Sequence, residues 1–341
     1  MVKTYFLYLA LLTLIISCGQ PEGNGQQEGI DRDALSLENE EVDFPDFNSD
    51  SAYHFIQRQV DFGPRVPSTE THKECANYLK NTLKRFAGNA QKQDARVRAY
   101  DGTPLDIYNI QSSFYPEYDK RVLLGAHWDS RPYADMAQDP EKQEEPIPGA
   151  NDGGSGVGVI LEIARILKEH DPGIGVDIVL FDAEDYGKPH FRQNHHSQNH
   201  EETWALGSQY WSRNLDDDHN IDKGILLDMV GAYDARFLFE GYSMKHAPSL
   251  TREVWDNAHQ LTYSNFFIKE RTIPITDDHK FVNEIAEIPM INIIDHDPDR
   301  HPHGFNEYWH THGDDMDIIS KRTLNAVGET VLKTLFDQKA Q

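Results

Sequence analysis

Cysteine is almost absent from this sequence: Cys18 and Cys75 are the only two among 341 residues. A disulfide framework and a structural zinc site built from four cysteines are therefore excluded. Cys75 falls in a segment with helical spacing, where a lone thiol is expected to be a small buried apolar side chain rather than a nucleophile.

Basic residues are also few, with 32 Lys and Arg against 57 Asp and Glu and a formal net charge of -25. Phosphate binding needs clustered Lys and Arg, and the sequence has no such cluster, so no nucleic-acid partner is expected. The same deficit argues against electrostatic binding to anionic lipid. No segment repeats with a period of 20–50 residues, so a solenoid or a propeller is not expected.

Long apolar runs are missing except at the N-terminus, where residues 5–16 follow Lys3. A transmembrane helix needs about 20 residues, so this run is too short for one. A basic start, an apolar stretch and a small residue before the break are typical of a secretory signal. Ile15-Ile16-Ser17-Cys18 resembles the bacterial lipobox, in which the cysteine is lipidated and becomes the first mature residue. We therefore expect a lipoprotein signal peptide at 1–17; an ordinary signal peptide with a nearby cysteine is the alternative.

Residues 18–48 are rich in Gly, Gln and Glu and contain few apolar side chains. Such a segment cannot bury enough surface to order itself, so we expect a flexible tether after lipidated Cys18 and a folded domain at 49–341. The lipid on Cys18 is then the only membrane attachment. The expected location is the cell envelope, periplasmic or associated with the outer membrane, and the expected state is a monomer.

Strands and helices alternate through the rest of the chain. Apolar or β-type runs predict strands at 94–100, 107–113, 121–126, 176–181, 225–230, 236–240 and 289–294. Helical spacing predicts helices at 51–62, 68–86, 156–168, 206–214, 248–261, from about 278, and at 320–337. Continuous apolar strands separated by helices indicate a single-domain α/β fold, with a mostly parallel central sheet and helices on both faces. In such a sheet, ligands bind beyond the carboxyl ends of the strands.

Acidic residues and histidines stand where these apolar segments end. They are His127, the pair Glu184 and Asp185, Asp228, Asp152 in a glycine-rich turn, and His310 in the loop after the last strand. Each alone has a structural explanation, such as a helix cap, a charged loop or a buried histidine. Together they would converge on one crevice, where several carboxylates repel one another. A divalent cation removes that conflict, and carboxylate plus imidazole suits zinc.

Five segments resemble, in order, the metal motifs of the M28 zinc aminopeptidase superfamily: GAHWDSRP, GANDGGSGVGVILEIAR, LFDAEDYG, LLDMVGA and YWHTHGDD. The resemblance spans roughly residues 51–340 and implies the zinc aminopeptidase-like fold, of the phosphorylase/hydrolase-like type, for the domain at 49–341. Within the superfamily the chain is most similar to the zinc-dependent glutaminyl-peptide cyclotransferases, or glutaminyl cyclases. Trp309 directly precedes His310 as in the cyclases, and Thr276-Asp277-Asp278-His279 matches their paired aspartates.

The cyclase resemblance implies one zinc ion per chain, held by Asp152, Asp185 and His310. It implies that Glu184 is the catalytic acid and base, that Asp228 and Asp277 are its buried aspartate partners, and that Trp309 and Trp204 are pocket walls. The implied reaction converts the N-terminal glutamine of peptides or proteins to pyroglutamate and releases ammonia. One departure from the pattern is Asn292, where animal cyclases carry a histidine bonded to the second aspartate.

Two other readings stay open. In a dizinc M28 aminopeptidase, His127 and Asp228 would bind a second zinc ion, Asp152 would bridge the two ions, and Glu184 would activate a hydroxide. In the third reading, the fold is an inactive, lipid-tethered binding protein. Two further segments interrupt the alternation of strands and helices. Residues 135–148 are expected to form an acidic, proline-bearing loop. The histidine-bearing insertion 186–203 is expected to be solvated and near the active site, and weak metal scavenging is its alternative.

Overall fold

The structure, a computed structural model, describes residues 43–192, 201–216 and 219–338. The expected signal peptide and most of the expected tether lie outside the described residues, as do three of the four histidines of the 186–203 insertion.

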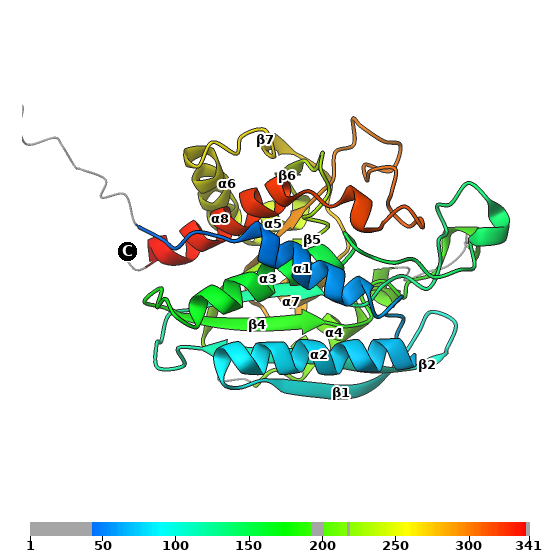
Figure 1. Cartoon of the computed structure of the whole chain (residues 1–341), viewed down its shortest axis with the longest axis horizontal. Coiled ribbons are helices and arrows are strands. Elements are labelled where there is room, and N and C mark those ends of the chain that lie inside the picture. The colour runs from blue at the N-terminus through cyan, green and yellow to red at the C-terminus, as the bar shows by residue number, and fades with distance from the viewer. Residues whose placement is uncertain (1–42, 193–200, 217–218, 339–341) are drawn as a thin grey trace, which may run out of the picture. The chain divides into compact units, whose positions relative to one another are not determined.

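A six-stranded sheet forms the centre of the domain (Figure 1), with strand order β1-β2-β4-β3-β5-β8. The strands are β1 (Gln91–Arg98), β2 (Pro104–Phe114), β3 (Arg121–His127), β4 (Gly175–Phe181), β5 (Ile221–Asp228) and β8 (Met290–Ile294). β4, β3, β5 and β8 are mutually parallel, whereas β2 pairs antiparallel with both β1 and β4. The mostly parallel sheet predicted from the continuous apolar strands is confirmed, and its antiparallel part is confined to one edge.

Helices cover both faces of this sheet, because alternate side chains of each buried strand point to opposite sides. Leu124 of β3 packs into the larger core with α1 (Ser49–Val60), α2 (Glu70–Ala87), α3 (Gly154–Leu167), α6 (Pro248–Gln260) and α8 (Lys321–Asp337). Its neighbour Leu123 packs on the other face against Trp211 of α4 (Leu206–Arg213) and Val282 of α7 (Asp278–Ile285).

Most helices begin and end close to where the sequence predicts, because their boundaries carry local signals. Thr69 caps α2 by accepting a hydrogen bond from the His72 amide, and Ser320 caps α8 in the same way. Gly88 ends α2 with a φ of +77°, a conformation that glycine adopts without steric cost. Cys75 of α2 is fully buried, as expected of a thiol that serves as an apolar side chain.

The sequence analysis missed two elements, α5 (Gly241–His246) and β7 (Phe267–Arg271); β7 pairs with β6 (Phe237–Phe239) in a second, two-stranded sheet. Both are too short to show a periodic apolar pattern, and β7 is mostly exposed. Single-turn 3₁₀ helices occur at Pro140–Lys142, His190–Arg192, Glu201–Thr203 and Met316–Ile318.

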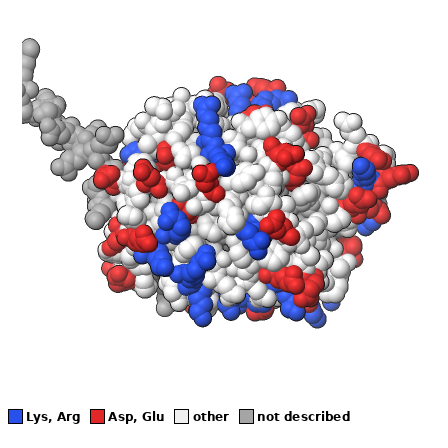
Figure 2. All heavy atoms as spheres, in the orientation of Figure 1, with Lys and Arg blue, Asp and Glu red and all other residues white. Residues whose placement is uncertain are grey.

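The folded body begins within the segment expected to be the tether. Phe47 is buried, with its ring against the backbone of Gly328 in α8, and Phe44 also packs on the core. These two aromatic side chains supply the apolar surface that the preceding residues lack. Among the described residues, no helix is long and apolar enough to span a bilayer. Acidic and basic side chains are interspersed over the face shown in Figure 2.

Candidate active site

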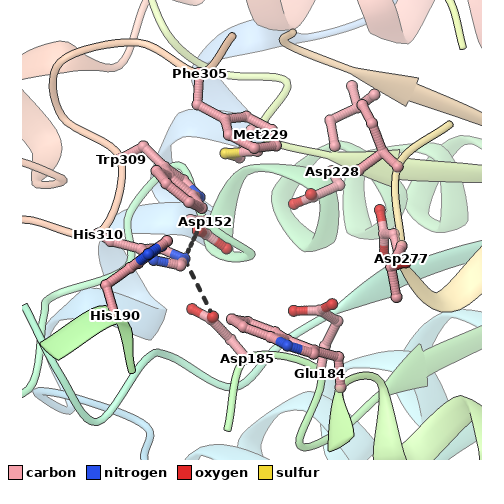
Figure 3. A pocket seen from close by; sticks show the side chains of 14 residues that line it. Asp152, Glu184, Asp185, His190, Asp228, Met229, Asp277, Phe305, Trp309 and His310 are labelled. Carbon is pink, nitrogen blue, oxygen red and sulfur yellow. Dashed lines mark ion pairs between the residues drawn. The ribbon is translucent and has the colours of Figure 1, made fainter. Parts of the chain in front are cut away.

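The side chains predicted at the strand ends meet in one cavity of about 260 Å³ (Figure 3). Its lining comprises Asp152, Glu184, Asp185, His190, Trp204, Asp228, Met229, Ile275, Thr276, Asp277, Ile294, Phe305, Trp309 and His310. His127 ends β3, Asp228 ends β5, and Glu184 and Asp185 lie in the turn after β4, so parallel strands bring them together as expected. Every predicted site residue except His127 lines this cavity, and His127 lies directly behind it in contact with two lining carboxylates.

One cluster in the cavity consists of Asp152, Asp185 and His310. His310 Nε2 lies 3.3 Å from Asp185 Oδ1 and 3.8 Å from Asp152 Oδ2, and one ligand atom of each residue falls within 4.8 Å of the others. A tetrahedral zinc ion with ligands at about 2.0–2.1 Å separates neighbouring ligand atoms by about 3.3 Å, so the spacing fits. Asp185 Oδ2 is buried without a hydrogen-bond partner, which a bound cation would satisfy.

Two buried carboxylates that the sequence analysis did not select hold the backbone of this cluster. Asp314 accepts hydrogen bonds from the amides of Asn151 and Asp152, at 2.7 and 3.1 Å. Asp129 accepts from the amides of Glu184 and Asp185, at 3.1 and 3.2 Å. Both residues stand within the motifs HWDS and HGDD, so the signal was present but carried no indication that the acids face inward.

A second cluster surrounds His127. Its Nε2 lies 3.0 Å from Asp152 Oδ1 and 3.2 Å from Asp228 Oδ1, and its Nδ1 lies 3.4 Å from Asp129 Oδ1. Burial lowers the pKa of His127, but these three carboxylates raise it more, so the pKa lies well above its ordinary value. The imidazole also rests on the backbone of Gly153, where an added Cβ would lie 2.5 Å from two of its ring atoms.

Three further carboxyl groups face the cavity opposite His310. Burial raises the pKa of Glu184 well above its ordinary value, and it raises the pKa of Asp228 to about 7, with Asp277 adding to both shifts. Burial also raises the pKa of Asp277, whose Oδ2 accepts a hydrogen bond of 2.5 Å from Asn292 Nδ2. Asn292 is therefore the hydrogen-bond partner of Asp277 at the position where animal cyclases carry a histidine.

Apolar and aromatic side chains complete the walls. The rings of Trp309 and His310 stack with centroids 3.7 Å apart, and Phe305 stacks on Trp309 at 4.5 Å. Trp204 lies parallel to the His310 ring at 6.2 Å, in the wall where the resemblance places it. Four apolar wall residues were not selected from the sequence, because a single apolar residue in a loop or at a strand end carries no pattern of a site: Met229, Ile275, Ile294 and Phe305.

Strained backbone accompanies the functional side chains. Ala183, Met229 and His310 have φ values of +51°, +50° and +55°, each at or beside a residue that lines the cavity. A non-glycine residue in this region costs about 1–2 kcal/mol, which the surrounding structure must offset. The left-handed conformation thus occurs at His310 and directly before Glu184, two residues whose side chains line the cavity.

Residues 109–335 match the peptidase family M28. The chain belongs to this family. Its fold is also that of the glutaminyl cyclase of Bacteroides thetaiotaomicron bound to N-acetylhistamine, with a TM-score of 0.83 and 49% identity over 86% of this chain and 99% of that chain. The glutaminyl cyclase of Porphyromonas gingivalis has a similar fold, with a TM-score of 0.80 and 48% sequence identity over 86% of this chain and 99% of that chain.

Not all similar structures carry the cyclase name. A Zn-dependent exopeptidase of Parabacteroides distasonis gives a TM-score of 0.83 and 48% identity, over 86% of this chain and 100% of that chain. The chain spans half or less of the length of the first curated relatives it matches, at 27–28% identity, and the second of these is an aminopeptidase. The comparisons therefore agree on the family and the fold.

Proposed function

We propose that this protein is a glutaminyl-peptide cyclotransferase that closes the N-terminal glutamine of peptides or proteins to pyroglutamate. One observation carries the proposal: a cavity of about 260 Å³ has the cluster of Asp152, Asp185 and His310 on one side, proton-binding carboxyl groups on the other, and stacked aromatic rings in its wall. Such a volume suits one side chain rather than a long segment of peptide. The cyclases at 48–49% identity support the same function.

Apolar walls would fold the glutamine side chain back on itself. Trp309, Phe305 and Ile275 contact the space that its two methylene groups would fill. The α-amine and the γ-amide carbon would then be held at reacting distance, which replaces a random encounter by a high effective concentration. Asp228 and Asp277 would accept hydrogen bonds from the amine and amide N–H groups and orient them.

Glu184 would move the proton. As the α-nitrogen bonds to the γ-carbon, the carboxylate takes one proton from the amine; it then returns that proton to the amide nitrogen, which leaves as ammonia. The raised pKa of Glu184 suits both directions of proton transfer near neutral pH. The backbone N–H of Glu184 is held by a hydrogen bond to Asp129. When bound by Asp152, Asp185 and His310, zinc would supply a Lewis acid for the γ-carbonyl oxygen.

We propose a single zinc ion, because the His127 cluster is already closed by direct contacts between its imidazole and two carboxylates. The second candidate, a dizinc aminopeptidase, is favoured by one observation: ligand atoms of His127, Asp152 and Asp228 also lie within 4.8 Å of one another.

Two assays on one purified preparation separate these functions. We expect ammonia release from a peptide with an N-terminal glutamine, none from the same peptide after N-acetylation, no hydrolysis of a leucine anilide, and about one zinc per chain. Leucine anilide hydrolysis with about two zinc ions and no ammonia release would refute the cyclase.

For the N-terminal region, which lies outside the described residues, we propose lipidation at Cys18 and a location in the cell envelope. Labelling with a radioactive fatty acid should be lost in Cys18→Ser, and labelling that persists would exclude this attachment.

A further inference from the structure

Asp135 differs from the rest of the acidic loop 135–148 that it opens. The following acidic residues, Asp139, Glu141, Glu144 and Glu145, are exposed, whereas Asp135 is buried with only 4% of its surface exposed. Closing the loop does not require this burial, because its stem is joined by Ile147 N to Arg131 O at 3.1 Å and by Ala134 N to Glu145 O at 2.8 Å. The burial of Asp135 therefore has another cause.

The carboxylate of Asp135 is fixed by Arg131. Arg131 Nε and Nη2 donate to its two oxygens, both at 2.7 Å, and Arg131 Nη1 donates to the carbonyl and the Oδ1 of Asp185, at 2.9 and 3.1 Å. The guanidinium is fully buried and lies over the Trp204 ring at 4.8 Å. A planar fork of this kind holds two carboxylates in a set geometry that a lysine could not reproduce.

From this position Asp135 contacts His310. Its Oδ1 lies 3.2 Å from His310 Nδ1, a buried nitrogen with no well-aligned hydrogen-bond partner, and the next amide, Met136 N, donates to the His310 carbonyl at 3.1 Å. Two consecutive residues thus hold the side chain and the backbone of a residue whose φ is +55°. A carboxylate at Nδ1 favours the tautomer whose Nε2 lone pair faces Asp152 and Asp185.

The same carboxylate reaches the mouth of the cavity. Asp135 Oδ2 accepts a hydrogen bond from the His190 amide at 2.8 Å. His190 belongs to the 186–203 insertion, lines the cavity, and places its ring edge-on to Trp309 at 5.9 Å.

We propose that Asp135 is a positioning residue that holds the imidazole of His310 for metal binding and fastens His190 at the mouth of the cavity. Asp135, in the acidic loop, then contacts both His310 and His190, the latter a residue of the insertion, through one buried carboxylate. The part of this proposal that concerns His310 needs only a metal site, and the part that concerns His190 rests on the proposed function.

Metal affinity tests the first part without any turnover. Removing a carboxylate behind a metal-binding histidine weakens the metal by about 10–100-fold, and we expect this loss in zinc affinity for Asp135→Asn, measured by competition with a chelator. Asp139→Asn, an exposed change in the same loop, is the matched control and should leave the affinity unchanged. Zinc affinity within about twofold of wild type in folded Asp135→Asn would overturn the proposal. Should that variant fail to fold, Arg131→Lys is measured instead. It should also weaken zinc binding, and an unchanged zinc affinity would likewise overturn the proposal.

The second part is tested by a pair of variants at residue 190. His190→Ala removes the imidazole, and His190→Pro also removes the backbone donor that Asp135 accepts. We expect His190→Pro to raise KM for a glutaminyl peptide further than His190→Ala does, with kcat and zinc affinity close to wild type in both. Equal KM values would refute the role of the Asp135 contact at the mouth, whereas absence of ammonia release in the wild type would refute the cyclase and leave the zinc result standing.

Discussion

Two histidines of similar surroundings face each other across Asp152, and their contacts differ in a way that residue type alone does not reveal. His310 Nε2 stands 3.3 and 3.8 Å from its carboxylates, and a buried oxygen of Asp185 beside it has no partner. His127 Nε2 stands 3.0 and 3.2 Å from its carboxylates, which are hydrogen-bonding distances.

The repulsion between buried carboxylates is therefore reduced in different ways around the two histidines. Around His127, a protonated imidazole would offset part of the charge of the carboxylates that it contacts. Around His310, the spacing leaves room for a cation between the groups. A set of metal-binding residue types thus predicts that a cation can bind, and the different contacts of the two histidines are one basis for the single zinc ion proposed above.

Removing each histidine in turn is the most direct test of the difference between the His310 and His127 clusters. His310→Ala should lose bound zinc and lower kcat/KM by roughly three orders of magnitude or more, because several kcal/mol of transition-state stabilisation depend on the metal. His127→Asn should keep the zinc content of the wild type. Zinc content is measured by elemental analysis after dialysis, with His312→Ala, a change in the same loop as His310, as the control. Loss of half the metal in His127→Asn would favour the dizinc reading.

The proton-transfer role separates from metal binding at Glu184. Glu184→Gln should lower kcat by about 10²–10⁴-fold, the usual contribution of a general acid and base, while zinc content stays that of the wild type. The amide preserves the size of the side chain and the Asp129 contact to its backbone, so the loss would report the proton rather than the fold. Near wild-type turnover in Glu184→Gln would exclude this assignment.

The smallest expected effect is the pH dependence of stability in chelator-treated protein. The pKa of His127 in the folded protein lies well above its ordinary value: burial lowers it, but Asp129, Asp152 and Asp228 outweigh that effect. Its stabilisation is therefore present below about pH 6.5 and lost as the pH rises through the folded-state pKa.

Asp228 acts in the same direction. Burial raises its pKa to about 7, so the folded state keeps a proton that the unfolded state has released, and this contribution is lost as the pH rises toward 7. We expect the melting temperature of metal-free protein to be a few degrees lower at pH 9 than at pH 6, at about 2–4 °C per kcal/mol. His127→Asn should flatten that slope, and added zinc should reverse it, because the ligands bind metal deprotonated. A melting temperature that rises from pH 6 to pH 9 without metal would contradict this account.

The fold was predictable wherever local chemistry repeats along the chain. Continuous apolar runs marked the parallel strands, and caps such as Thr69 and Ser320 marked helix starts. The short elements α5 and β7 were missed because they owe their existence to tertiary contacts. Glu240, which caps the start of α5, accepts hydrogen bonds from the amides of Tyr242 and Ser243 and also contacts His279 at 2.9 Å, a partner 39 residues away.

The site was predictable for the residues whose position at strand ends is visible in the sequence. Asp129, Asp135 and Asp314 were not identified as supports, because only the three-dimensional arrangement shows that their carboxylates point inward. Asp135 is the clearest case: its neighbours in sequence are exposed acids, and nothing in their pattern separates the one that is buried.

Gly153 has a consequence for redesign of this enzyme. A methyl group at this position would collide with the His127 ring, so the imidazole lies directly against the main chain. It has no free volume on that side into which it could move. A protein engineer who wanted to install a second cation would therefore have to displace the carboxylates of Asp152 or Asp228 instead. On that side, the backbone of Gly153 limits where the imidazole can lie.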